Sequence, residues 1–128
     1  MRLLLDTHTF LWFISGHRTL STRARRAIES SRNQKYLSVA SVWEMAIKVR
    51  IGKLKVGLPL REALATGMSE GDIAFLSVER DHALGVAELP LHHEDPFDRL
   101  LIAQARAEDL RMVTKDDAFD EYDVSRLW

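Results

Sequence analysis

The chain opens with a short apolar run, Leu3-Leu4-Leu5, which is followed at once by Asp6 and by Thr7-His8-Thr9. A run with no polar face is typical of a strand that is buried on both sides in a parallel sheet. In an open α/β sheet, ligands bind beyond the carboxyl ends of the strands. We therefore predict a first strand over residues 2–6 and treat Asp6 as a candidate site residue. The alternative for Asp6 is a purely structural role as the N-cap of the helix that follows.

Strands and helices are expected to alternate along the rest of the chain. Further strands are predicted over residues 36–39, 73–78, 111–114 and 124–127. Helices are predicted over residues 8–15, 21–29, 41–51, 60–65, 79–88 and 95–108. Ser21 and Asp95 have the side chains preferred at N-caps, Pro96 suits a first helical turn, and Gly52 suits a helix end. This alternation predicts an α/β fold of three layers, with a mostly parallel central sheet flanked by helices, in one domain over residues 1–128.

Charge is divided unevenly along the chain, although the formal net charge is only −1. Residues 1–61 hold twelve Lys and Arg but only three acids, Asp6, Glu29 and Glu44, whereas residues 62–128 hold six Lys and Arg and sixteen acids. The small net charge argues against a protein that coats nucleic acid without specificity. The absence of cysteine excludes disulfides and thiolate metal sites. With an acid at position 6 and no apolar run of about 20 residues, we expect a cytoplasmic protein without a membrane segment.

Glu44 is the second candidate carboxylate. It borders an apolar stripe at helical spacing, formed by Val39, Val42, Trp43, Ala46 and Ile47, which we expect to be buried. The alternative is an ion pair between Glu44 and Lys48 at i,i+4, which would contribute only about 0.3–0.5 kcal/mol.

Asp98 and Asp116 complete the set of candidate carboxylates. Asp98 stands in the first turn of a very apolar helix, and Asp116 follows the strand that ends at Thr114. Thr7 and Thr114 could orient neighbouring carboxylates or serve as ordinary turn hydroxyls. If the acids converge, their repulsion favours a hard divalent cation with oxygen ligands, Mg²⁺ or Mn²⁺. The five histidines show no zinc-ligand spacing, so we assign them no metal site.

Four segments together resemble the PIN-domain family, specifically its VapC-type toxins. They are Leu3-Leu4-Leu5-Asp6-Thr7-His8, the stretch from Ser38 to Lys48, the stretch from Asp95 to Ala105, and Val113-Thr114-Lys115-Asp116. The resemblance implies a Rossmann-like sheet and a metal-dependent endoribonuclease, with Asp6, Glu44, Asp98 and Asp116 as the acidic metal cluster. It also implies a homodimer and a cognate antitoxin whose C-terminal segment occupies the active-site groove. The family's Thr-x-Asp pattern favours Asp116 over the adjacent Asp117 as the fourth acid.

Two surfaces are candidates for binding these partners. Basic residues that could follow an RNA backbone are Lys48, Arg50, Lys53 and Lys55, with Arg23, Arg25 and Arg26 as a second choice. Aromatic residues that could form an apolar groove for an antitoxin peptide are Trp12, Phe13 and Trp43, with core packing as the alternative.

Two other functions compete with the nuclease. One is a noncatalytic PIN-like module that binds RNA or protein. The other is an aspartate-based phosphotransferase of the haloacid-dehalogenase or receiver type. The first type needs a second acid where this chain has His8, and the second type needs a pair of acids near the end of the first strand, which this chain lacks.

Overall fold

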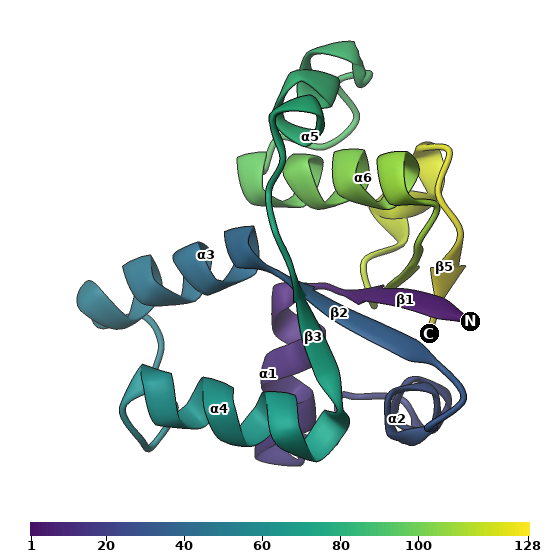
Figure 1. Ribbon diagram of the computed structural model, residues 1–128. Helices are drawn as coiled ribbons and strands as arrows, with labels where there is room; N and C mark the ends of the chain where they lie inside the picture. Colours follow the sequence, from purple (N-terminus) through teal and green to yellow (C-terminus); the bar gives the residue numbers. More distant parts are fainter.

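A five-stranded sheet lies at the centre of the computed structural model, which describes all residues from Met1 to Trp128 (Figure 1). The strands are β1 (Arg2–Leu5), β2 (Gln34–Ser38), β3 (Ile73–Leu76), β4 (Arg111–Val113) and β5 (Arg126–Leu127). Their spatial order is β3-β2-β1-β4-β5, and every neighbouring pair is parallel. The helices are α1 (Thr7–Ser15), α2 (Thr22–Glu29), α3 (Val39–Arg50), α4 (Leu60–Gly71), α5 (Arg80–Gly85) and α6 (Pro96–Glu108). Two 3₁₀ turns, η1 (Val86–Glu88) and η2 (Asp117–Glu121), complete the chain. The predicted α/β class and parallel sheet are confirmed.

The central strand β1 is buried on both faces and separates two apolar layers. Leu3 and Leu5 lie in one core with residues of α1, α2 and α4, whereas Leu4 lies in a second core with residues of α6 and η2. Figure 1 shows α1, α2 and α4 on one side of the sheet and α5 and α6 on the other. This arrangement explains the apolar run in the sequence, because alternate side chains of a strand point to opposite faces.

The boundary between β2 and α3 differs from the prediction of a strand over 36–39 and a helix from Ser41. The strand begins earlier, at Gln34, and the helix begins at Val39. Ser38 is the N-cap, because its hydroxyl accepts a hydrogen bond from the Ala40 N–H at 3.0 Å. The polar start of β2 concealed the strand, since the buried Lys35 satisfies its ammonium group on the Ser30 carbonyl at 3.0 Å.

Helix α4 is longer than predicted, ending at Gly71 instead of near Ala65. Glycine is generally unfavourable inside a helix, yet α4 contains Gly67 and Gly71. Here Gly67 permits close packing on α1, since a Cβ atom at this position would lie 2.4 Å from Ile14 Cγ2. The strand that follows is shorter than predicted, ending at Leu76 instead of residue 78.

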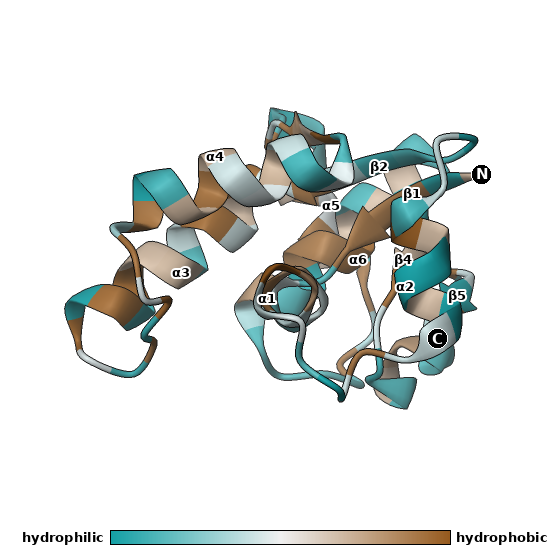
Figure 2. Cartoon of the chain, turned by 90° about the horizontal axis from the view of Figure 1, so that it is seen from below, coloured by the Kyte–Doolittle hydropathy of each residue, from teal (hydrophilic) through white to brown (hydrophobic).

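The orientation of α3 is also opposite to the prediction. Trp43 is 62% exposed, and Val39 and Ile47 are exposed as well, whereas Ser41, Glu44 and Met45 are buried. The cause is that α3 packs against α1 and α6 with its less apolar side. Figures 1 and 2 show α3 and α4 extending together to the same side of α1. Consequently Glu44 points inward, toward the carboxyl end of the sheet. None of the helices is both long enough and apolar enough to cross a membrane.

Candidate active site

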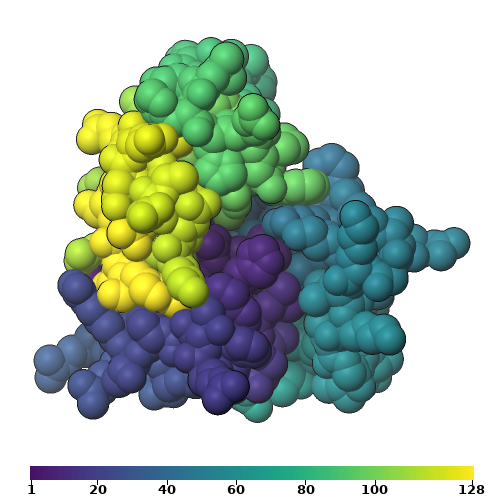
Figure 3. All heavy atoms as spheres, turned by 180° about the vertical axis from the view of Figure 1, so that it is seen from behind, coloured from purple at the N-terminus to yellow at the C-terminus, as the bar shows by residue number.

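Four carboxylates from distant parts of the chain approach the carboxyl edge of the sheet. Asp6 follows β1 directly, and Asp116 follows β4 after two residues. Glu44 comes from α3 and Asp98 from the first turn of α6. The negative charges of Asp6 and Glu44 both help to raise the pKa of Asp98, so these two carboxylates lie near that of Asp98. Figure 3 shows the N-terminal segment, in purple, reaching the surface between the yellow and green C-terminal part and the blue and teal α3–α4 part.

Asp6 serves as the helix cap and also points into this cluster. Its Oδ1 accepts a hydrogen bond from the Thr9 N–H at 2.7 Å, which caps α1. Its Oδ2 accepts one from the Thr114 hydroxyl at 2.5 Å. The two readings of the sequence, cap and site residue, therefore do not exclude each other. The hydrogen bonds fix the orientation of the carboxylate while leaving further lone pairs on both oxygens.

Glu44 is oriented by two side chains. Its Oε1 accepts a hydrogen bond from the Thr7 hydroxyl at 2.7 Å, and its Oε2 lies 2.8 Å from Lys48 Nζ. The ion pair at i,i+4 is therefore present, but Glu44 as a whole is only 6% exposed. A buried charge of this kind needs partners, and here one hydroxyl and one ammonium group supply them. Thr7 and Thr114 thus both orient a carboxylate, as the sequence had suggested.

Asp98 is the most perturbed of the four acids. Burial and the neighbouring carboxylate of Asp95 raise the pKa of Asp98 from 3.8 to about 7, with smaller contributions from Asp6 and Glu44. His93 acts in the opposite direction and lowers this pKa. Strong perturbation by burial together with like charges is characteristic of functional sites. Ionised Asp98 is therefore costly in this position without additional positive charge.

His93 lies between two of the acids, although the spacing of the histidines had suggested no site for them. Its Nε2 hydrogen bonds with Asp116 Oδ2 at 3.0 Å and lies 3.1 Å from Asp98 Oδ2. These three side chains have ligand atoms within 4.8 Å of one another, which is close enough to share one ion. Spacing could not reveal His93 because its partners are carboxylates, not other histidines. The only local signal was its position in the loop just before the Asp95 cap.

The loop that carries His93 is held by two buried groups. The Tyr122 hydroxyl accepts hydrogen bonds from the N–H groups of His92 and His93, at 3.1 and 2.8 Å, and donates one to the Pro90 carbonyl at 3.0 Å. The Arg99 guanidinium donates to backbone carbonyls of the same segment, including that of Pro90 at 2.8 Å. The sequence drew attention to neither residue. Together they hold the backbone of the loop that carries the His93 ring.

The residues present fit a hard divalent cation. The site offers carboxylate oxygens from four segments, and its strongest perturbation is the cost of ionising Asp98 among other acids. A cation with a preference for oxygen ligands would remove that cost, as Mg²⁺ and Mn²⁺ do in comparable sites. Asp116 shares the cluster through His93, and its Oδ1 also caps η2 by accepting from the Ala118 N–H at 3.0 Å. The adjacent Asp117 is exposed and is not part of the group.

A groove of about 610 Å³ lies between α1, α4 and the segment that joins α3 to α4, and Lys48, the ion-pair partner of Glu44, is part of its lining. Its lining includes Trp12 and other apolar residues, together with Lys48, Lys53 and Lys55. Phe13 and Trp43 do not line this groove. Phe13 packs near Gly71 of α4, and Trp43 packs edge-on against Phe97 with ring centroids 5.4 Å apart. Of the three aromatic residues predicted to form one groove, only Trp12 therefore lines it.

Comparison with known proteins gives a consistent result. The PIN domain family model matches residues 3–125. Similar solved structures include VapBC2 from Rickettsia felis bound to a promoter DNA fragment, with TM-score 0.76, 17% identity and coverage of 99% of this chain and 98% of that one. DNA-bound VapBC from Salmonella typhimurium has TM-score 0.70 and 15% identity, covering 99% and 97%. VapC20 from Mycobacterium tuberculosis, a toxin that cleaves the sarcin–ricin loop, has TM-score 0.67 and 17% identity, covering 93% of each chain. No curated protein sequence matches this chain. Because the family model spans nearly the whole sequence, the chain belongs to the PIN domain family.

Proposed function

We propose that the protein is a metal-dependent endoribonuclease and the toxin of a toxin–antitoxin pair. The observation that carries the proposal is the convergence of Asp6, Glu44, Asp98 and Asp116, with the pKa of Asp98 raised to about 7. Clustered ionised carboxylates repel one another and destabilise the fold in the absence of a cation, which disfavours a noncatalytic binding module. Similarity to VapC20, a toxin that cleaves the sarcin–ricin loop, supports RNA as the proposed substrate.

The proposed role of the four acids is to hold Mg²⁺ or Mn²⁺. When bound, a divalent cation supplies charge that favours ionisation of an attacking water and stabilises negative charge on the phosphate. Thr7 and Thr114 keep Glu44 and Asp6 oriented by the hydrogen bonds described above. Lys48 neutralises part of the charge of Glu44 and stands at the border between the acids and the groove. We assign Lys48 to the phosphate nearest the site, because its side chain is still 36% exposed.

The groove lined by Lys48, Lys53 and Lys55 is the proposed path for RNA and the proposed binding site of an antitoxin segment. Its three lysines suit a phosphate backbone or acidic side chains, and Trp12 with neighbouring apolar residues suits an apolar anchor. Arg50 is exposed at the end of α3 and would extend the basic surface. Competition for one groove would explain inhibition, since an antitoxin segment seated there would exclude the substrate. Both partners would be encountered in the cytoplasm.

A homodimer is part of the same proposal. The exposed apolar side of α3, formed by Val39, Trp43 and Ile47, is the surface we assign to a second copy of this chain. Burying this apolar surface between two copies would remove the exposed Trp43 side chain from water, which is favourable. Molar mass measured by light scattering on the parent chain and on Trp43→Glu tests this assignment. A monomeric parent would contradict it.

RNA cleavage by the purified chain is the direct test. We expect cutting of total RNA with Mg²⁺ or Mn²⁺, loss with EDTA, and loss in Asp98→Asn. Asp117→Asn is the matched control, because Asp117 is exposed and lies outside the cluster, and it should cut normally. RNA binding without cleavage under every metal would favour the noncatalytic module. Cleavage that persists in EDTA would contradict the metal-dependent mechanism.

A further inference from the structure

His93 lies among the clustered acids, and its ring offers a hydrogen-bond donor or a metal ligand that the acids themselves do not supply. Its ring is 16% exposed and packs edge-on against Phe119, with centroids 5.9 Å apart. Nε2 faces Asp116 and Asp98, whereas Nδ1 faces the backbone of its own loop. The two ring nitrogens therefore have different partners, and these partners determine where the proton lies.

The Asp95 N–H donates a hydrogen bond to His93 Nδ1 at 3.1 Å. A backbone N–H can only donate, so Nδ1 must be the unprotonated nitrogen that accepts. The proton of the neutral ring is therefore on Nε2, where it donates to Asp116 Oδ2 at 3.0 Å. An Nε2–H group cannot ligate a metal through the same nitrogen. The geometry thus separates two roles that a histidine among carboxylates could have, namely metal ligand and hydrogen-bond donor.

We propose that His93 is a positioning residue, whose Nε2–H holds Asp116 and the adjacent Asp98 in place for a divalent cation without itself ligating the cation. The inference rests on the proposed metal site and deepens it. One donor placed between two like-charged carboxylates reduces their repulsion and fixes their separation. Tyr122 and Arg99 support this role, because they hold the backbone of residues 90–93 through the hydrogen bonds described above.

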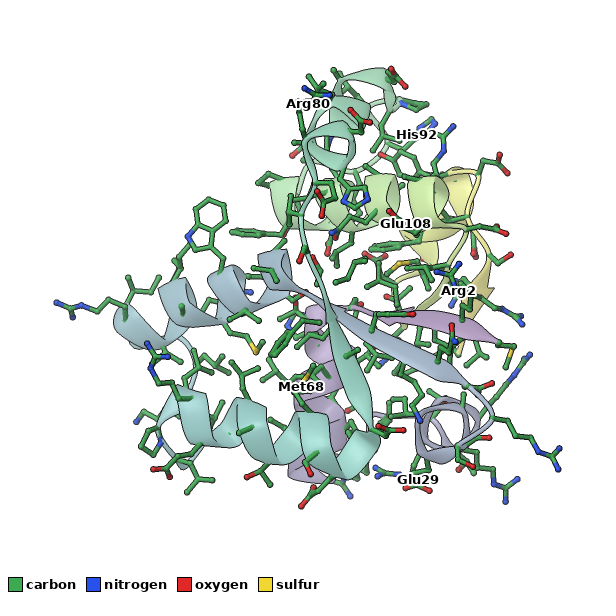
Figure 4. The ribbon with its side chains drawn as sticks, in the orientation of Figure 1. Arg2, Glu29, Met68, Arg80, His92 and Glu108 are labelled. Carbon is green, nitrogen blue, oxygen red and sulfur yellow. The ribbon has the colours of Figure 1, made fainter.

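Substitutions at residue 93 can distinguish the two roles. His93→Phe keeps an aromatic ring but removes the donor, whereas His93→Gln places an amide N–H near the position of Nε2. His92→Phe is the matched control, since His92 is exposed, packs on Tyr122, and lies above α6 away from the sheet (Figure 4). Folding of each variant is checked by thermal unfolding. The readout is Mn²⁺ affinity of the purified chain, measured by electron paramagnetic resonance of the free ion.

We expect His93→Phe to weaken Mn²⁺ binding by about 10- to 100-fold, the usual effect of losing an outer partner of a ligand. His93→Gln should recover affinity to within about threefold of the parent, and His92→Phe should bind normally. Unchanged binding in His93→Phe would overturn the inference alone. Failure of His93→Gln to recover binding would also overturn it, because the donor would then not be the essential feature. A parent chain that binds no Mn²⁺ would overturn the proposed metal site and the inference with it, whereas normal Mn²⁺ binding without RNA cleavage would overturn only the proposed activity.

A second readout needs no variant. Nitrogen-15 NMR of the histidine rings at mildly alkaline pH reports which nitrogen carries the proton. We expect Nε2–H for His93, retained when Mg²⁺ is added. An Nδ1–H tautomer in the metal-free protein would remove the proposed donor, and loss of the Nε2 proton on adding Mg²⁺ would identify His93 as a ligand. Either result would overturn the inference.

Discussion

Replacing Asp98 by Asn should stabilise the metal-free protein at alkaline pH. The folded structure raises the pKa of Asp98 from 3.8 to about 7, chiefly by burial and by the nearby Asp95. Between these two values the folded protein keeps a proton that the unfolded chain releases. The free energy of unfolding therefore falls as pH rises through this interval, by about 1.4 kcal/mol per pH unit. Asn has no proton to lose, so the variant lacks this slope.

The size of the effect follows from the same values. A difference of about three pKa units corresponds to a loss of about 4 kcal/mol in the free energy of unfolding. This loss is complete once the pH exceeds the pKa of Asp98 in the folded protein. The Asp98 side chain is 26% exposed, so solvent screening makes this an upper limit. The variant's advantage in free energy of unfolding should thus grow by up to about 4 kcal/mol between about pH 4 and about pH 8. Any constant change in hydrogen bonding cancels in this comparison.

Urea unfolding in EDTA, followed by circular dichroism at both pH values, measures the effect. Asp117→Asn, at an exposed acid, is the control for the substitution itself. A difference between variant and parent that stays the same at both pH values would refute the reasoning. Saturating Mg²⁺ at the higher pH should reduce the variant's advantage, because a cation would offset the cost of the ionised carboxylate.

Four further predictions concern packing, RNA and the antitoxin. Gly67→Ala should lower the free energy of unfolding by about 1–3 kcal/mol, because its Cβ would lie 2.4 Å from a side chain of α1. Gly85→Ala should be neutral or stabilising in the same urea assay, since its Cβ would meet its nearest neighbour at 3.6 Å. Lys48→Ala should slow RNA cleavage more than Arg23→Ala does, because Lys48 contacts Glu44, and equal rates in a cleavage time course would contradict its assignment. Trp12→Ala should weaken binding of the cognate antitoxin by about tenfold or more in calorimetry, and unchanged affinity in a folded variant would remove Trp12 from the groove's contact surface.

Much of the architecture was predictable because it depends on local patterns. Leu3-Leu4-Leu5 has no polar face, so it predicts a strand covered on both sides, and β1 is indeed central in the sheet. Asp95 followed by Pro96 predicts the start of α6 at the residue where the structure begins it. The proximity of Asp6, Glu44, Asp98 and Asp116 was expected from the resemblance, and for Asp6 and Asp116 also from their positions after strand ends. Their roles in metal binding remain predictions for the experiments above.

Tertiary structure decided the features that depend on contacts between distant segments. The apolar stripe of α3 predicted a buried side, but packing on α1 and α6 buried Glu44 and left Trp43 exposed. A periodicity shows that a helix has two sides without showing which side meets the core. Likewise, no local pattern in residues 90–95 brings His93 to Asp116. Tyr122 and Arg99 hold that loop in place from more distant points in the chain, and such hydrogen bonds form only when the chain has folded.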